Sequence, residues 1–360
     1  MGYARCMNCM KLINTGATCP HCGTPQQTDV NYPYAMRPNT ILLGKYLIGR
    51  VLGMGFSDIT YVGFDTILER KVAVKEYFPH GLVGETTCFQ DLWKKGVDSY
   101  GRHYQGVDHF LAFGLEMEKP GSLPGIVPVR DVFQANQTGY LVMDFVEGES
   151  LRSRIKTKGP ESFETCTSLF GPLIDSLAKL HRQGLLHKNI FPDTILVQEN
   201  GSCVLLYPGT GQPSSSYLSE AMSFRDSHLP PECLTEKGAC GPWTDVYELC
   251  AAMYYAVTGK DVPATMGRIA ADRDFLESAV QYTVRGTYLP YRAVPILRAG
   301  LAVDPKERPQ SMDALKRRLQ QEVAEEKSFS QRDRSFFPEA NLVGLVYGPP
   351  PEFDQEDKKR

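Results

Sequence analysis

The order of local patterns along the chain is the feature that most constrains its fold. Short apolar runs of strand length fill the region from Leu43 to about Met143, and amphipathic helical patterns fill the region from Ser162 onward. Strands that come first and helices that come later are typical of an α+β fold. The predicted strands cover residues 46–52, 59–64, 71–76, 129–133 and 139–143, and a helix is predicted between them at about 107–118.

Two longer helices are predicted in the second half of the chain. In the first, apolar residues recur at three- and four-residue spacing from Phe163 to Leu180, which makes one face of a long helix. The second is predicted to begin at a Thr244 cap and to end at Gly259, because these residue types suit the two ends of a helix. Its apolar stripe comprises Val246, Leu249, Cys250, Met253 and Val257.

The first 22 residues hold two Cys-x-x-Cys pairs. Each pair can place two thiolates on one side of a metal, so two pairs can close a tetrahedral site. A segment this short has no core of its own, so metal binding would supply its folding energy. Two disulfides or a redox pair are the alternatives, and His21 is interpreted as a turn residue or as a replacement for one cysteine. The predicted ligands of a structural zinc ion are Cys6, Cys9, Cys19 and Cys22.

Composition limits the class of protein. The net charge of −3 gives no reason to expect nucleic acid or an anionic membrane as partner. The most apolar stretch, 249–257, is far shorter than the roughly 20 residues that span a bilayer, and residues 1–10 lack the apolar core of a signal peptide. We therefore expect a cytoplasmic protein with no membrane span. In a reducing compartment the scattered cysteines are expected to be small buried side chains: Cys88, Cys166, Cys203, Cys233, Cys240 and Cys250.

Two motifs in the strand-rich region could bind a nucleotide. The stretch Leu-Gly-Met-Gly, which contains Gly53 and Gly55, is a glycine-rich hairpin that could lie over phosphates, although a plain β-turn is the alternative. Lys75 follows Val-Ala-Val in an apolar strand, as a lysine that holds the α- and β-phosphates would. A lysine on a solvated face is the alternative for this residue.

With the motifs that follow in order, the chain from Leu43 to about Leu319 resembles bacterial serine/threonine protein kinases. It is most similar to those that begin with a short zinc ribbon and carry Lys-Glu-Tyr-Phe-Pro after the third strand, here at 75–79. Residues 140–151 resemble the hinge between the lobes, with Met143 in the gatekeeper place. The nucleotide-binding positions that the resemblance implies are Gly53, Gly55, Ala73, Lys75, Met143, Asp144 and Val146.

The resemblance also implies a bilobal fold and its internal anchors. A strand-rich N-lobe and a helical C-lobe would follow the zinc ribbon. Segments 230–232, 241–247 and 304–309 look like the anchors of the helical lobe. Glu232 is then expected to pair with Arg308, and Asp245 to brace the catalytic loop.

The catalytic positions depart from the family pattern. Asn189 stands in place of the catalytic aspartate, and Thr194 in place of the asparagine that binds magnesium. Tyr207 stands in place of the metal-binding aspartate, and Asp58 replaces the third glycine of the phosphate loop. Phosphoryl transfer depends on positioning and electrostatic stabilisation, and loss of a general base alone costs roughly 10²- to 10⁴-fold.

Three acidic residues are candidate substitutes: Glu116 for the partner of Lys75, and Asp193 and Asp58, the latter expected on a mobile loop, for the lost metal-binding groups. Phe113 occupies the helix position where the family has the glutamate that pairs with the lysine, and Glu116, one turn later, is the nearby substitute. Asp193 precedes Thr194, but ordinary members often carry an acid there without a metal role.

The resulting expectation is a degenerate kinase, a pseudokinase, that acts as a binding or regulatory module in signalling. This expectation favours a protein without enzymatic activity. ATP is expected to bind weakly or not at all, without magnesium, and the partner is expected to be a protein, with an active kinase as one candidate. The alternatives are a divergent but active serine/threonine kinase that uses ATP, and a nucleic-acid binder that acts through the zinc ribbon. Residues 1–40 hold only Arg5, Lys11 and Arg37 against Asp29, which is little positive charge for a nucleic-acid surface.

The predicted domains follow from these assignments. The zinc ribbon covers 1–23, a linker covers 24–43, and a protein-kinase-like domain covers 44–322, with its N-lobe at 44–143 and its C-lobe at 147–322. Residues 323–360 form a charged tail that contains proline. The serine-rich region 210–229 is interpreted as a set of phosphorylation sites or as a flexible loop.

Overall fold

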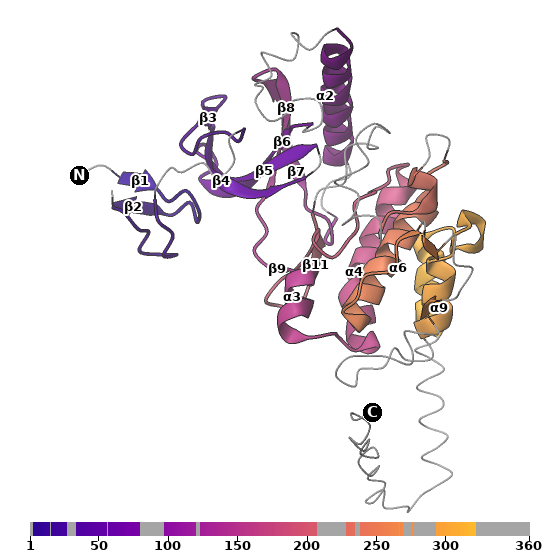
Figure 1. The fold of residues 1–360 in the computed structure, drawn as a ribbon. Coiled ribbons are helices and arrows are strands. Elements are labelled where there is room, and N and C mark those ends of the chain that lie inside the picture. The colour runs from indigo at the N-terminus through magenta and orange to yellow at the C-terminus, as the bar shows by residue number, and fades with distance from the viewer. Residues whose placement is uncertain are drawn as a thin grey trace, which may run out of the picture. The chain divides into compact units, whose positions relative to one another are not determined.

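The protein was analysed as a computed structural model, whose ribbon is drawn in Figure 1. The chain divides into two compact units, Met1–Arg318 and Leu319–Arg360, and the predicted tail lies outside the described residues. The structure describes residues 3–14, 16–26, 34–55, 57–79, 97–119, 123–206, 228–234, 238–265, 267–268, 275–276 and 293–321.

The N-terminal segment folds as a small hairpin with two cysteine-bearing turns. Strands β1 (Tyr3–Arg5) and β2 (Leu12–Asn14) pair antiparallel. The turn between them closes with a hydrogen bond from the Met10 amide to the Cys6 carbonyl, and the second turn closes in the same way from Gly23 to Cys19. Met10 and Gly23 share a left-handed backbone, with φ of 59° and 70°. The two turns are therefore alike in conformation, as expected for two metal knuckles.

A six-stranded sheet follows, and every pair of neighbouring strands in it is antiparallel. All five strands predicted from the sequence are present, and their bounds extend beyond the predicted ones by two residues at most. The strand order is β3-β4-β5-β6-β8-β7. The strands are β3 (Ile41–Leu42), β4 (Tyr46–Met54), β5 (Asp58–Asp65), β6 (Arg70–Tyr77), β7 (Val129–Ala135) and β8 (Thr138–Asp144).

One helix, α2 (Val97–Glu118), packs against strands β7 and β8 (Figure 1). A Cβ added at Gly114 would lie 2.2 Å from the Leu141 side chain, so the helix lies close to β8. The predicted helix at 107–118 covers only the second half of α2. The prediction missed the first half because its apolar spacing is weak.

The residues just before the sheet cover part of one of its faces. Ala35 is buried in the same apolar cluster as Tyr46, Ile59 and Val74. This cluster encloses the carboxyl group of Glu76, which accepts hydrogen bonds from the hydroxyls of Tyr61 (2.6 Å) and Tyr140 (2.9 Å). Burial raises the pKa of Glu76. The Met36 amide donates to the Tyr61 hydroxyl at 3.0 Å, which ties the chain before the sheet to this buried network.

The second half of the chain is helical, as predicted. Its helices include α3 (Leu151–Lys158), α4 (Phe163–Arg182), α6 (Pro242–Thr258) and α9 (Ala293–Gly300), with short 3-10 helices η3 (Pro231–Leu234) and η5 (Pro305–Glu307). A three-stranded sheet accompanies them, in the order β11-β10-β9. Its strands are β9 (Glu149–Ser150), β10 (Ile195–Val197) and β11 (Cys203–Leu205).

Helix α6 corrects two details of the prediction. Its N-cap is Gly241 and its first residue is Pro242, so Thr244 is the third residue of the helix and not the cap. Thr244 still stabilises the first turn of the helix, because its hydroxyl oxygen accepts a hydrogen bond from the Gly241 amide. Residues from Thr244 to Thr258 are all buried, so α6 has no single apolar stripe and is instead a central helix. The C-cap at Gly259 is left-handed, as predicted.

The cysteine hairpin contacts the six-stranded sheet directly. Met10 is buried with Val62 and Phe64, and Phe145 packs against this cluster. The Arg50 amide donates to the Met7 carbonyl at 2.8 Å, and the Arg5 guanidinium lies 3.4 Å from the centre of the Phe64 ring. The hairpin therefore shares its core with the sheet.

Candidate functional site

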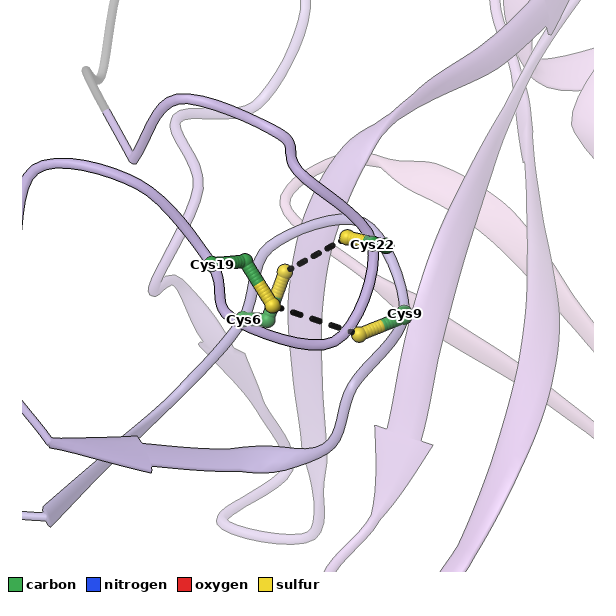
Figure 2. A group of neighbouring side chains, drawn as sticks. All are labelled: Cys6, Cys9, Cys19 and Cys22. Carbon is green, nitrogen blue, oxygen red and sulfur yellow. Dashed lines mark hydrogen bonds between the residues drawn. The ribbon is translucent and has the colours of Figure 1, made fainter.

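Four cysteine side chains converge between the two N-terminal turns (Figure 2). The sulfur atoms of Cys6, Cys9, Cys19 and Cys22 all lie within 4.8 Å of one another. Two of the separations are 3.6 Å (Cys6 to Cys22) and 3.8 Å (Cys9 to Cys19). Four sulfurs at about 2.3 Å from a central zinc ion would be about 3.8 Å apart. These thiols are free, because a disulfide needs sulfurs at about 2.05 Å.

Backbone amides point at the first cysteine of each pair. The amide of Asn8 donates to Cys6 Sγ, and that of His21 donates to Cys19 Sγ, both at 3.4 Å. Such donors favour the thiolate form that binds metals. The His21 ring is exposed and its Nε2 lies 3.3 Å from the Leu12 carbonyl oxygen. Within the described residues His21 belongs to no ligand cluster, which fits its interpretation as a turn residue.

Lys75 forms an ion pair with the acid that replaces the third loop glycine. The ammonium of Lys75 lies 2.8 Å from the Asp58 carboxylate, and the two side chains are only 12% and 17% exposed. The same carboxylate covers Gly55, where an added Cβ would lie 2.8 Å from both of its oxygens. The Gly55 amide donates to the Asp58 carbonyl at 2.8 Å. Asp58 thus lies between the glycine-rich hairpin and the lysine.

Glu116 is the partner for Lys75 that the sequence suggests, but the structure gives Glu116 another contact. Glu116 pairs with Lys119 on the exposed side of α2. Phe113 is half-buried on the same helix. The pair of Asp58 and Lys75 was not predicted, although the alternation of side chains along paired strands could have indicated it. Thr60 lies opposite Lys75 across β5 and β6, and Asp58 is two residues from Thr60 on the same face.

The predicted hinge residues include the last residues of β8 and the segment that follows it. Met143 is buried opposite Ala73, and Asp144 lies opposite Val72. The Asp144 carboxylate is bound by Arg70 at 3.2 Å and by Arg130 at 2.9 Å. Asp144 therefore braces the strands on either side of it, and Val146, two residues later, is half-buried.

The segment at the catalytic-loop position is held by Asp245 of α6. The carboxylate accepts the amides of His187 and Lys188, each at 2.7 Å, and contacts His181 Nε2 at 2.7 Å. Lys188 has a left-handed backbone with φ of 54°. Burial alone would raise the pKa of Asp245, but the His181 contact and the loop amides lower it. The implied bracing contact of Asp245 with this loop is present in the structure.

The His187 ring is buried under the same loop. Its Nε2 lies 2.9 Å from the Leu206 carbonyl oxygen. Burial lowers the pKa of His187 to about 4, so the ring is neutral near pH 7. The residue therefore has a structural contact, and sequence reasoning gave it no role.

The two loop positions that lost their family residues are occupied by structural side chains. Thr194 donates its hydroxyl to the Asn189 carbonyl at 2.7 Å and accepts the Phe191 amide at 3.1 Å. Asn189 itself is buried. Asp193 is bound by Arg152 at 2.6 Å, and Arg152 also holds Asp261 at 3.1 Å. Tyr207 lies outside the described residues.

The expected anchor of the helical part is a buried, two-pronged ion pair. Arg308 donates to both oxygens of Glu232, at 2.8 and 3.0 Å. The Thr244 hydroxyl donates to the same carboxylate at 2.8 Å. Breaking a buried pair of this kind is strongly destabilising, because it leaves one charge uncompensated.

Comparisons with known proteins agree on one family. The protein kinase domain family matches residues 115–319. Sperm motility kinase Z of Mus musculus is 26% identical over 283 residues, which are 76% of this chain and 54% of that protein. Serine/threonine-protein kinase PknL of Mycobacterium tuberculosis is 27% identical over 227 residues, 61% of this chain and 51% of that protein. The chain spans about half the length of the curated relatives it matches.

Solved structures give the same result for the fold. The structure named PpkA-294 apo form matches with a TM-score of 0.63 and 26% identity, over 79% of this chain and 99% of that one. Rad53 1-466 in complex with AMP-PNP matches in fold with a TM-score of 0.52 and 16% identity, over 75% of this chain and 64% of that one. Both likenesses support the bilobal α+β fold expected from the sequence.

Proposed function

This chain belongs to the protein kinase domain family and has its fold, and on that premise we propose that it is a pseudokinase. In this proposal it is a kinase-shaped module that binds and regulates a protein partner and has lost phosphoryl transfer. The N-terminal ribbon holds one structural zinc ion.

The catalytic loop is the observation that carries the proposal. Between His187 and Thr194 the only acidic residue is Asp193, and Arg152 binds its carboxylate. The residue at the general-base position is Asn189, whose amide cannot take a proton from a substrate hydroxyl. Kinase chemistry requires a base in this loop. Its absence supports a protein that acts by binding.

Magnesium does not fit the residues at these positions. Mg²⁺ prefers carboxylate and other oxygen ligands in a nearly ideal octahedron. The Thr194 hydroxyl is already used by the backbone of its own loop, and Asp193 is used by Arg152. We therefore derive no catalytic step through magnesium.

Nucleotide binding in this proposal is weak and indifferent to Mg²⁺. Lys75 would have to release Asp58 before it could hold phosphates, and the Asp58 carboxylate would then repel the phosphates it faces. A thermal-shift titration with ATP measures this directly, because ligand stabilisation grows as RT ln(1 + [L]/Kd). A gain in melting temperature that depends on Mg²⁺ would count against the proposal.

The zinc proposal rests on the convergence of four sulfurs at the separations of a tetrahedral site. Cysteine ligands in this number are typical of closed structural sites. Elemental analysis of the purified protein should find one zinc ion per chain. Cys22→Ser should lose it.

The test of the proposed function is a radiolabelled-phosphate assay with a general protein substrate. The wild type and Asn189→Asp are expected to show only background transfer. Catalytic groups act as a unit, so restoring one of them leaves the rate limited by the groups that are still missing. The control is Lys75→Met. Wild-type transfer that Lys75→Met abolishes would establish a working kinase and overturn the pseudokinase proposal.

A further inference from the structure

Two thiols outside the zinc ribbon lie side by side near the catalytic loop. Cys233 Sγ and Cys240 Sγ are 3.5 Å apart. Cys233 belongs to the short helix η3, and Cys240 directly precedes Gly241, the N-cap of α6. Both side chains are half-buried. Both were predicted to be small buried side chains, and their partial exposure corrects that prediction.

The backbone on each side of the thiol pair is held by independent contacts. Glu232, next to Cys233, is fixed by the Arg308 ion pair. An added Cβ at Gly238 would lie 1.8 Å from the Glu232 carbonyl oxygen. The chain thus returns against η3 at a residue that must be glycine, and this return brings Cys240 to Cys233.

One thiol of the pair, Cys240, differs chemically from the other cysteines of the helical part, whereas the pKa of Cys233 is raised by its hydrogen bond with Cys240 and by burial. Cys166, Cys203 and Cys250 are buried, and burial raises the pKa of each. For Cys240, the hydrogen bond from the Cys233 thiol and the charge of Lys188 outweigh burial and lower the pKa to about 6. A thiolate that is partly exposed and close to a cation is the reactive form of cysteine.

We propose that Cys233 and Cys240 are a peroxide-sensitive dithiol that closes to a disulfide in this chain. The Cys240 thiolate attacks one oxygen of a hydroperoxide, the O–O bond breaks, and the departing oxygen leaves as water or an alcohol after taking a proton. The Cys233 sulfur then attacks the sulfenic acid on Cys240, the S–O bond breaks, and a second oxygen leaves as water. The two thiols lose two electrons and two protons, and the hydroperoxide is reduced.

The disulfide would join the segment behind Glu232 to the start of α6. The charge of Lys188 acts on Cys240 at this junction, and the Lys188 amide is held by Asp245 near the start of the same helix. Oxidation would therefore place a covalent tie beside the catalytic loop. The proposal is independent of the proposed function, since it needs neither nucleotide nor phosphoryl transfer.

The experiment uses the full chain with its zinc, reduced and then exposed to hydrogen peroxide. Trypsin cleaves after Lys237, between the two cysteines, so the disulfide links peptides 226–237 and 238–260. Mass spectrometry without reductant should find this linked pair at a mass about 2 Da below the sum of its parts, and dithiothreitol should separate it. Fragmentation distinguishes Cys240 from Cys250 in the second peptide.

Two matched variants fix the order of events. Cys233→Ser should give no linked peptide but a sulfenic acid on Cys240 that dimedone traps. Cys240→Ser should give neither product. Cys240 of the wild type should react at least about tenfold faster than Cys166 and Cys203. A wild type with no linked peptide, or a link from either residue to Cys250 or to the ribbon, would overturn the proposal.

Discussion

Asp58 is paired with Lys75, the residue that the proposed weak nucleotide binding would use to hold a phosphate. Asp58→Asn keeps the shape of the side chain and removes its charge, so the Lys75 ammonium loses its partner at 2.8 Å. We expect the affinity for ATP without Mg²⁺ to rise roughly tenfold, since release of one charged hydrogen bond is worth about 1.4 kcal/mol. Isothermal titration calorimetry or a thermal-shift titration measures the change.

The matched control for Asp58 is Glu116. This acid was the candidate partner from the sequence, and it pairs with Lys119 on the surface of α2. Glu116→Gln should leave the affinity for ATP unchanged. Equal effects of the two variants would mean that the bulk charge of the lobe, and not the pair with Lys75, sets nucleotide affinity.

His187 links stability to pH. The folded protein binds the proton on this ring with a pKa of about 4, below the ordinary value of 6.5, because burial penalises the charged form. The unfolded chain therefore holds more protons between these values, and the stabilisation present above pH 6.5 is lost as the pH falls toward 4. We expect the wild type to lose about 2 kcal/mol of unfolding free energy from this ring between pH 7 and pH 5.

The His187→Gln variant separates this ring from other titrating groups. Glutamine can donate to the Leu206 carbonyl, which His187 contacts, but it does not titrate. Urea unfolding at pH 7 and pH 5 should show a smaller loss for the variant than for the wild type. Equal losses would assign the pH dependence to other residues.

At the residue scale, the sequence predicted what spacing or motif encodes directly. The four ribbon cysteines were predicted because Cys-x-x-Cys spacing fixes which side of a turn two sulfurs occupy. The contact of Arg308 with Glu232 was implied by resemblance, and the two side chains meet as expected. Two contacts were not predicted. The contact of Asp58 with Lys75 is a diagonal cross-strand pair, which depends on the register of β5 and β6. The contact of Cys233 with Cys240 depends on the close approach of Gly238 to Glu232.

At the scale of elements, Gly49 on β4 is the point where the ribbon reaches the sheet. An added Cβ there would lie 2.3 Å from Met10 Cε, 2.4 Å from the Met7 carbonyl oxygen and 2.8 Å from Val62. Gly49→Ala should therefore push the ribbon from the sheet and cost about 1 to 3 kcal/mol of unfolding free energy.

The control for Gly49 lies on the same strand. No atom lies within 4 Å of a Cβ added at Gly53. Gly53→Ala should therefore change the unfolding free energy by less than about 0.5 kcal/mol. Chemical denaturation of both variants tests the pair. Similar losses of unfolding free energy in both variants would mean that β4 requires the backbone freedom of glycine at each position and that the ribbon does not contact Gly49.

Elements with strong periodicity were predicted best. The strands of the large sheet and helix α4 were found because apolar residues recur at the strand or helix period over their length. The first half of α2 and the short strands β1, β2 and β9 lack such a signal. Helix α6 was found, but its burial on all sides follows from packing between other elements, which local periodicity does not encode.

At the scale of the whole molecule, removal of the proposed zinc ion should destabilise the sheet as well as the ribbon. The Cys6 to Met10 turn, which carries two of the proposed zinc ligands, also supplies Met10 to the cluster of Val62 and Phe64. Chelation should unfold the ribbon, uncover this cluster and lower the melting temperature by at least about 5 °C. Differential scanning calorimetry with and without a zinc chelator measures the shift.

The Cys6→Ser variant is the control for chelation. It should melt at the temperature of the chelated wild type, and the chelator should lower it no further. A wild type whose melting temperature is unchanged after its zinc is removed would show that the metal stabilises the ribbon alone.

The sequence predicted the order of the parts but not how the ribbon and sheet join. A strand-rich part followed by helices was enough to expect an α+β fold, and the motif resemblance implied the kinase fold that the comparisons then support. Residues 24–43 were expected to be a linker because their composition is polar and lacks periodicity. Their last part instead packs on the sheet through Ala35 and the Met36 amide, a contact that only the folded partner surface creates. Among the residues the structure describes, no helix has the length and apolar character needed to cross a membrane.

The shared core of Met10, Val62 and Phe64 has a consequence for how such genes can be recombined. A ribbon and a lobe that bury one another are inherited as a pair, because each carries half of the contact. A lobe transferred without its ribbon would expose Val62 and Phe64 and leave the open backbone at Gly49 uncovered.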